Sequence, residues 1–341
     1  MNTDEQDKSV KAASPEAFTF GEPEGVLDGN AMMDYYECWA NGKWYEPPVS
    51  FEGLAKFFRA NQHHSSAIYV KRNILVSGFK PHKLLSRTEF SKWVLDFLTY
   101  GNGYVEEVPN MLGQRLPFKR AMALHMRRGV QPDKYYMLHG IRQEHEFEEG
   151  AIFHLEEPDV KQEVYGLPEY LASIHSGLLN ESATIFRRRY YKNGSHAGFI
   201  LYMSDAAQTE DDVDALRQAL KDSKGPGNFR NLFMYSPNGK KDGLQVIPIS
   251  EVTAKDEFFN IKNITRDDVL AAHRVPPSMM GIIPQNTAGF GDVEKAAKVF
   301  MVNELEPLQR RFQELNEWAG IDLVQFDPYA LEESVSRAAS M

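Results

Sequence analysis

Two adjacent prolines, Pro276 and Pro277, divide residues 254–318 into two predicted helices joined by a loop. A residue that precedes proline is pushed out of the α region, so the first helix must end at Val275. Five apolar side chains recur before that point at roughly helical spacing, and they are Phe258, Ile261, Ile264, Val269 and Ala272. This spacing predicts that all five face the same packing partner.

The second predicted helix begins at Gly291-Asp292, where the Asp292 carboxylate can accept from free backbone amides. Its apolar side chains alternate at steps of four and three, which predicts one buried stripe: Met301, Leu305, Leu308, Phe312 and Leu315. Pro307 lies inside this helix and removes the backbone hydrogen bond to Asn303. We therefore expect a kink at that point.

The connection between the helices, Pro276–Gly291, is nearly uncharged and rich in glycine and proline. Loops of this length are usually either functional or unstructured connections. Composition alone leaves both interpretations open.

The first half of the chain predicts a mixed helical and β-rich unit. Ser50 can cap one helix, and Thr88 begins a second that ends at Gly101. The second helix is the clearest amphipathic segment, with Phe90, Trp93, Val94, Phe97 and Leu98 on one face. Short strands with glycine and proline turns are expected from there to His154.

A longer helix is predicted after Tyr165-Gly166-Leu167-Pro168. Its apolar stripe is narrow, which favours packing against other helices: Leu167, Leu171, Ile174, Leu178 and Ile185. Four cations gather at its far end, and they are Arg187, Arg188, Arg189 and Lys192. They could contact DNA phosphates or an acidic neighbour, or they could simply complement the negative end of the helix dipole.

Composition narrows the class of protein. The 341 residues are 42% hydrophobic and 25% charged, as in soluble globular proteins. No run of about 18 apolar residues predicts a membrane span, and the polar start Met1–Glu5 does not look like a signal peptide. The single cysteine, Cys38, excludes an intrachain disulfide and is interpreted as packing filler, because no base partner is evident.

No cofactor or metal site is expected. The histidines His63-His64, His139, His145 and His154 lack the spacing that presents metal ligands on one face. The sequence also lacks a phosphate-binding loop, a dinucleotide-binding glycine motif and a nucleophile elbow. These patterns favour a protein that is not an enzyme. A nucleic-acid enzyme with an unrecognised site is the distant alternative.

Several motifs resemble the portal proteins of tailed bacteriophages, in particular those of the PBSX type from phages with contractile tails. They are Val275-Pro276-Pro277-Ser278-Met279-Met280-Gly281, Gly101-Asn102-Gly103-Tyr104 and Lys192-Asn193-Gly194. The resemblance covers roughly residues 50–318 and implies an α+β portal fold. Its segments would be an N-terminal arm (1–49), a mixed α/β wing (50–165), a stem helix (166–198), a small α/β clip (199–250), a second stem helix (251–275), a tunnel loop (276–291), a kinked tunnel helix (292–319) and a C-terminal tail (320–341).

The resemblance implies a ring of about twelve subunits at one capsid vertex, through which double-stranded DNA is packaged and ejected. The tunnel-loop residues facing the DNA would be Ser278, Met279, Gln285, Asn286, Thr287 and Phe290. Implied partners are terminase and then head-completion proteins at the clip, and the major capsid or scaffold protein. The implied location is the virion, preceded by the host cytoplasm during assembly, with no membrane association.

The net charge of −10 fits this interpretation in one respect. Tight DNA binding relies on clustered Lys and Arg, whereas an acidic ring would keep a passing duplex from adhering. The negative balance could equally serve solubility alone. The alternative function is a structural connector or tail ring that has no direct role in DNA translocation.

Overall fold

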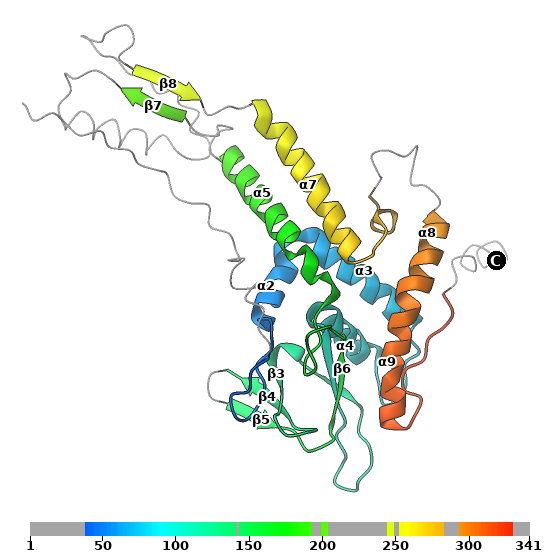
Figure 1. Cartoon of the computed structure of the whole chain (residues 1–341). Coiled ribbons are helices and arrows are strands. Elements are labelled where there is room, and N and C mark those ends of the chain that lie inside the picture. The colour runs from blue at the N-terminus through cyan, green and yellow to red at the C-terminus, as the bar shows by residue number, and fades with distance from the viewer. Residues whose placement is uncertain are drawn as a thin grey trace, which may run out of the picture.

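The computed structural model describes residues 38–140, 143–192, 199–203, 244–248, 252–282 and 293–329, with only the backbone at 189–192, 199–203, 244–248 and 252–259. An antiparallel pair of long helices, α5 (Ile174–Lys192) and α7 (Val252–Ala272), rises from a body of shorter helices and small sheets (Figure 1). Strands β7 (Phe199–Met203) and β8 (Leu244–Pro248) pair antiparallel at the far end of these helices. The sequence predicts strands at 199–203 and 244–249 but not how they pair.

Three helices form one side of the body: α2 (Phe51–Ala60), α3 (Gln62–Gly78) and α4 (Arg87–Tyr100). The predicted cap at Ser50 is confirmed, because its side chain accepts from the Gly53 amide. The predicted end of α4 at Gly101 is also confirmed, with the glycine at φ 68°. The start of α4 is one residue earlier than predicted, since Ser86 rather than Thr88 serves as the cap.

Two three-stranded antiparallel sheets complete the β-rich part of the body. Strand β1 (Asn102–Glu106) lies between β2 (Lys119–Ala121) and β6 (Ile152–Glu156). In the second sheet, which follows the 3-10 turn η1 (Ala123–His125), strand β4 (Tyr135–His139) lies between β3 (Met126–Arg128) and β5 (Gln143–Glu146). The prediction of short strands up to His154 is confirmed.

Asn102 joins the Gly101–Tyr104 motif to the Tyr165–Pro168 segment by hydrogen bonds. Its fully buried side chain donates to the Gly166 carbonyl at 2.7 Å and accepts from the Gly166 amide at 2.9 Å. A Cβ at residue 166 would lie 2.2 Å from the Gly101 oxygen, so only glycine fits. The segment that leads into the helix pair is therefore locked to the end of α4.

The helix pair begins with a 3-10 turn, η2 (Glu169–Ser173), which continues directly into α5. Helix α5 contacts α7 through polar side chains: Asn180 donates to the Thr265 hydroxyl at 2.7 Å. Ile174 is buried as predicted, but Ile264 is 61% exposed. The prediction for Ile264 is wrong because α7 faces α5 with Thr265, and this turns the preceding side chain outward.

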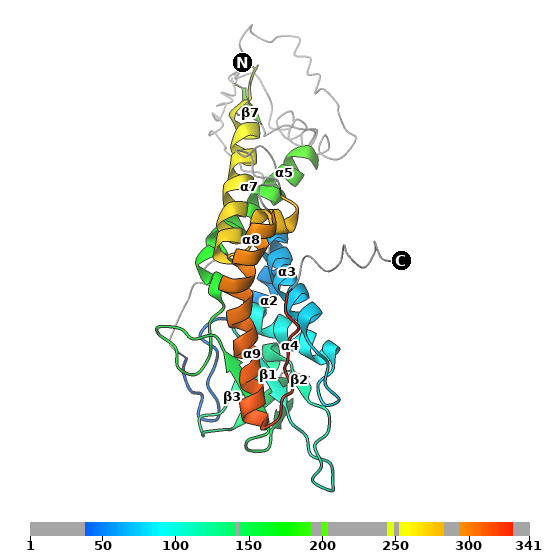
Figure 2. The same cartoon turned by 90° about the vertical axis from the view of Figure 1, so that its right-hand side faces the viewer.

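The C-terminal rod consists of α8 (Val293–Phe300), the π-helical turn η4 (Met301–Leu305) and α9 (Glu306–Ala319). All five apolar residues predicted for its stripe are at most 7% exposed. In η4 the Glu306 amide bonds to the Met301 carbonyl, directly before Pro307. Both views show α8 and α9 as one continuous rod without a sharp bend (Figures 1 and 2). Where the sequence predicted a kink, the π-helical turn accommodates Pro307 instead.

The body contains two apolar clusters. The first joins α3 and α4 to the rod through Phe90, Trp93 and Phe312, whose rings meet edge to face. The second joins α2 and the sheets to the base of the helix pair through Phe57, Tyr104 and Tyr170. Among the described residues, no helix is long and apolar enough to cross a membrane.

Several predicted segments lie outside the described residues. They are most of the N-terminal arm, most of the loop between Pro276 and Gly291, and the end of the tail. Within the 199–250 segment, the sequence also predicts a helix from Thr209 and a strand at 231–235, and both lie outside the described residues.

Candidate functional site at the helix junction

Helix α7 ends at Ala272, three residues before the predicted end at Val275. Arg274 adopts a left-handed conformation at φ 54°, and the Val275 amide bonds back to the Leu270 carbonyl at 3.1 Å. A left-handed non-glycine residue costs on the order of 1 kcal/mol. The Arg274 side chain compensates through ion pairs that fix the direction in which the chain leaves the helix.

Those ion pairs belong to a charge network that we call the junction: Lys71, Glu169, Arg274 and Glu304. Lys71 and Glu304 form its buried part, whereas Glu169 and Arg274 reach the surface. Lys71 of α3 pairs with Glu304 of the π-helical turn and, at 3.3 Å, with Glu169 of η2. Arg274 pairs with Glu169 at 2.7 Å and with Glu304 at 3.3 Å. The side chains of Lys71 and Glu304 are only 2% and 7% exposed.

The junction connects four elements that are far apart in sequence. It joins the body helix α3, the base of α5, the end of α7 and the middle of the rod. Buried charges are tolerated only when they are paired, so Lys71 and Glu304 must stay together, and Glu169 and Arg274 add ion pairs at the edge of that buried pair. Burial favours a higher pKa for Glu169, but Lys71 and Arg274 outweigh it and hold the pKa below its ordinary value. Glu169 therefore stays ionised.

Two histidines pack beside the junction. The Nδ1 atom of His64 lies 2.8 Å from Nε2 of His273, and both rings contact Tyr170. Burial, followed by the nearby charge of Lys71, lowers the pKa of His273 to about 3. Burial also lowers the pKa of His64 well below its usual value, and His273 adds to this effect. The pair is thus neutral and shares one hydrogen bond.

The rod is held to the body by a second ion pair. Arg311 bonds to Glu157 at 2.7 Å and lies over the Phe97 ring. The Glu157 amide in turn donates to the Gly101 carbonyl at 2.7 Å, next to the Asn102 lock. A cavity of about 20 Å³, lined by Lys71, Glu157 and His273 among others, lies between these contacts. It has room for one water molecule.

The sequence-predicted site residues are only partly described. Ser278 and Met279 lie in the 3-10 turn η3 (Pro277–Met280), and Met279 packs partly against the first apolar cluster. Arg187 and Arg188 are exposed near the far end of α5, and Arg189 and Lys192 belong to the same helix. The remaining predicted loop residues lie outside the described residues: Gln285, Asn286, Thr287 and Phe290.

Sequence reasoning missed the junction and the histidine pair. Lys71 and Glu304 are 233 residues apart, and His64 and His273 are 209 apart. A signal was present, because Lys71 and Glu304 interrupt apolar stripes at helical spacing. In the part of the chain that the structure describes, no three His, Cys, Asp or Glu side chains gather as a metal site.

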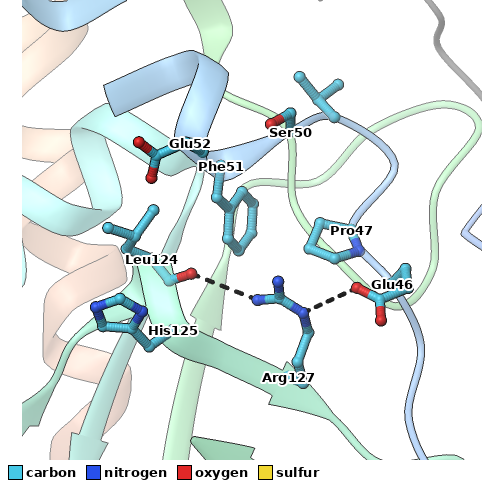
Figure 3. Close-up of a pocket in the computed structure, with 9 residues that line it drawn as sticks. Glu46, Pro47, Ser50, Phe51, Glu52, Leu124, His125 and Arg127 are labelled. Carbon is cyan, nitrogen blue, oxygen red and sulfur yellow. Dashed lines mark hydrogen bonds and ion pairs between the residues drawn. The ribbon is translucent and has the colours of Figure 1, made fainter. Parts of the chain in front are cut away.

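A larger hollow of about 330 Å³ lies at the start of α2 (Figure 3). The Arg127 guanidinium donates from Nε to the Glu46 carboxylate at 3.0 Å and from Nη1 to the Leu124 carbonyl at 3.4 Å. The Ser50 hydroxyl accepts from the Gly53 amide as a helix cap. These side chains have structural roles, and they give the hollow no evident chemistry.

Known proteins resemble this chain in both sequence and fold. Residues 74–337 match the family described as phage portal protein. The chain belongs to the phage portal protein family. It is 52% identical to the probable portal protein of Escherichia phage P2 over 95% of each chain. It is 38% identical to the probable portal protein of Haemophilus phage HP1, over 82% of this chain and 81% of that protein.

Solved structures with the same fold include a portal protein of the HK97 family from Corynebacterium diphtheriae. The TM-score is 0.57 at 15% identity, over 84% of this portal protein and 96% of that chain. A chain in the neck of a native gene transfer agent particle, computed with C12 symmetry, has a TM-score of 0.57 at 18% identity. The match covers 84% of this chain and 87% of that chain. The portal family is shown by these matches, whereas the PBSX subtype stays a prediction.

The general role of portal proteins is to form the channel for DNA packaging. The α+β portal fold expected from the sequence is confirmed by the structural likeness.

Proposed function

We propose that about twelve copies of this portal protein close into a ring, and that the loop between α7 and α8 faces the DNA in its channel. The observation that carries the proposal is the junction, because it fixes both helices from which the loop departs. A loop whose two flanking helices are tied to each other by ion pairs can touch a moving duplex without pulling its own helices apart.

The proposed DNA-facing residues of the loop are neutral: Ser278, Met279, Gln285, Asn286, Thr287 and Phe290. Neutral groups contact a duplex without the counterion release that makes cationic surfaces adhere to it. The chain's net charge of −10 supports the same principle. Low affinity for DNA suits a conduit through which the genome must slide.

The basic end of α5 has a different proposed role. Arg187 contributes to lowering the pKa of Lys262 on α7, after burial as the main cause, so it lies close to the partner helix. We assign Arg187, Arg188, Arg189 and Lys192 to contacts among helices and neighbouring subunits. These cations also complement the negative end of the α5 dipole.

The segment 199–250 is proposed as the docking site for terminase and afterwards for head-completion proteins. The major capsid or scaffold protein would surround the ring, which assembles in the host cytoplasm. The chain would act as a conduit and not as an enzyme, with the ATP-driven motor on another polypeptide. The proposed segment boundaries are those of the arm, wing, stem, clip and tunnel given above.

Deletion of residues 282–290 tests the role of the loop. We expect rings of normal size in electron micrographs, together with a loss of packaged DNA or of its retention in the particle. A matched control replaces Met111 and Leu112, which are exposed at a hairpin tip of the body, with serine. Normal packaging and retention by the deleted variant would contradict the proposal.

A further inference from the structure

The helix pair carries an apolar patch on its open side. Leu179 of α5 is 50% exposed and Ile264 of α7 is 61% exposed. Leu179 directly precedes Asn180, and Ile264 directly precedes Thr265, and these two following residues contact each other. Leu179 and Ile264 therefore lie at the same height along the helix pair. Because the helices run antiparallel, one step back along each chain turns both side chains to the same side.

That open side faces away from the body. The residue after Asn180 on α5 is Glu181, which is 8% exposed. The residue after Thr265 on α7 is Arg266, whose side chain is 16% exposed. The Asn61 side chain at the start of α3 also bonds to the Gly177 carbonyl of α5, at 3.2 Å. The body therefore covers one side of the helix pair and leaves Leu179 and Ile264 on the other.

The rod carries a second apolar patch. Val299 and Val302 are 59% and 56% exposed, and their spacing of three places them on one face of the rod. The opposite face holds Phe300, Met301 and Leu305 in the first apolar cluster. Helices α7 and α8 stand on either side of the turn that follows α7 (Figure 1). Both patches stay exposed, so neither covers the other within one chain.

The exposed charges beside the Leu179–Ile264 patch are acidic, whereas those beside the Val299–Val302 patch are mixed. Asp267 and Asp268 are exposed beside Ile264, and Asp268 accepts from the Ser176 hydroxyl of α5 at 2.9 Å. Lys298 is exposed beside Val299. Lys298 lies four residues before Val302, and Glu306, which pairs with Arg310 at 3.9 Å, lies four residues after it. Contacts between complementary charges at the rim of an interface fix its register and suppress wrong pairings.

We infer that the Leu179–Ile264 patch of one subunit packs against the Val299–Val302 patch of the next. A closed ring needs a head-to-tail contact between two different surfaces of each chain, and these two patches supply one. The inference rests on the proposed ring and goes further, since it names the partner as a second copy and identifies the surfaces. Each loop would then be fixed by its own junction on one side and by its neighbour's helix pair on the other.

Cysteine cross-linking tests the contact. In a Cys38→Ser background, the double variant Ile264→Cys/Val299→Cys is assembled and treated with a short bismaleimide. A head-to-tail contact predicts a ladder of covalent multimers beyond the dimer. Each single variant should give dimers at most, because one cysteine per chain cannot extend a ladder. The pair Leu179→Cys/Val302→Cys provides a second, independent measurement.

The control variant is Ile264→Cys/Met111→Cys, which combines one patch residue with an exposed methionine of the body hairpin. An equal ladder from this control would overturn the inference. Rings in electron micrographs without a ladder from either test pair would also overturn it, while leaving the proposed function intact. Absence of rings from the parent chain would remove the proposed function and the inference together.

Discussion

The body and the helix pair bury different kinds of residue. The body encloses aromatic clusters, in which Trp93 and Phe312 are fully buried. The helix pair includes the polar contact Asn180–Thr265 and leaves Leu179 and Ile264 exposed. The body therefore encloses its own apolar core, whereas the helix pair keeps an apolar surface that a second copy would cover in the proposed ring.

The junction lies where the two regions meet. It combines the buried pair Lys71–Glu304 with the more exposed side chains Glu169 and Arg274. Breaking a buried ion pair by removing one partner is strongly destabilising, so this pair holds the two regions in one arrangement. A ring subunit benefits from this arrangement, because the angle between body and helix pair sets how its neighbours fit. The comparison can be tested by variants that act on one region and spare the other.

The largest effect is expected from Lys71→Met at the junction. The change leaves Glu304 buried without its main partner, which should lower the free energy of unfolding by about 3–5 kcal/mol. Urea unfolding of the purified chain, followed by tryptophan fluorescence, measures the loss. Lys43→Met removes an exposed ion pair with Glu144 and should leave the unfolding midpoint unchanged.

A rescue variant separates charge from packing. Lys71→Met combined with Glu304→Leu removes both charges of the buried pair and should restore much of the lost stability. If Lys71→Met proves as harmless as Lys43→Met, the junction does not lock the four elements together.

A smaller effect is expected from two buried asparagines, one in each region. Asn102→Ala leaves the Gly166 amide and carbonyl unpaired in the body, and should destabilise the whole chain by about 1–3 kcal/mol. Asn180→Ala should spare the unfolding midpoint of the body but speed hydrogen exchange in α5 and α7. Equal losses of global stability from both variants would contradict a division between the two regions.

The smallest effect at neutral pH concerns His273, because its contribution to stability changes only below about pH 6.5. His273 has a folded pKa of about 3, below the ordinary value of 6.5, so the unfolded chain binds more protons as the pH falls. Its contribution to stability is complete above pH 6.5 and is lost progressively from there toward pH 3. His273→Gln should make the fall less steep, by at most about 1.4 kcal/mol per pH unit.

The control for this measurement is His175→Gln, at an exposed position of α5. It should leave the pH dependence of the unfolding midpoint unchanged. An unaltered slope in His273→Gln would show that the histidine pair titrates in the folded chain much as it does in the unfolded one.

Sequence patterns predicted the features that depend on neighbouring residues, such as helix caps, helix ends and buried stripes. The cap at Ser50, the glycine end of α4 and the buried stripe from Met301 to Leu315 follow from helix periodicity and end preferences. The family resemblance supplied the portal fold, which the similar proteins confirm.

Contacts between distant segments were beyond the same reasoning. The sequence placed Ile264 in the packed stripe, because periodicity cannot tell which face a polar contact such as Asn180–Thr265 will occupy. It also predicted a kink at Pro307, where the structure has a π-helical turn. Glu304 lies in that turn and pairs with Lys71, which explains why a local rule for proline could not give the geometry.

Electron microscopy of the purified full-length chain under assembly conditions tests the central claim most directly. We predict closed rings of identical subunits, with the helix pairs standing around an opening wide enough for a DNA duplex. A chain that stays monomeric at all concentrations, or forms open filaments without a central channel, would contradict the account.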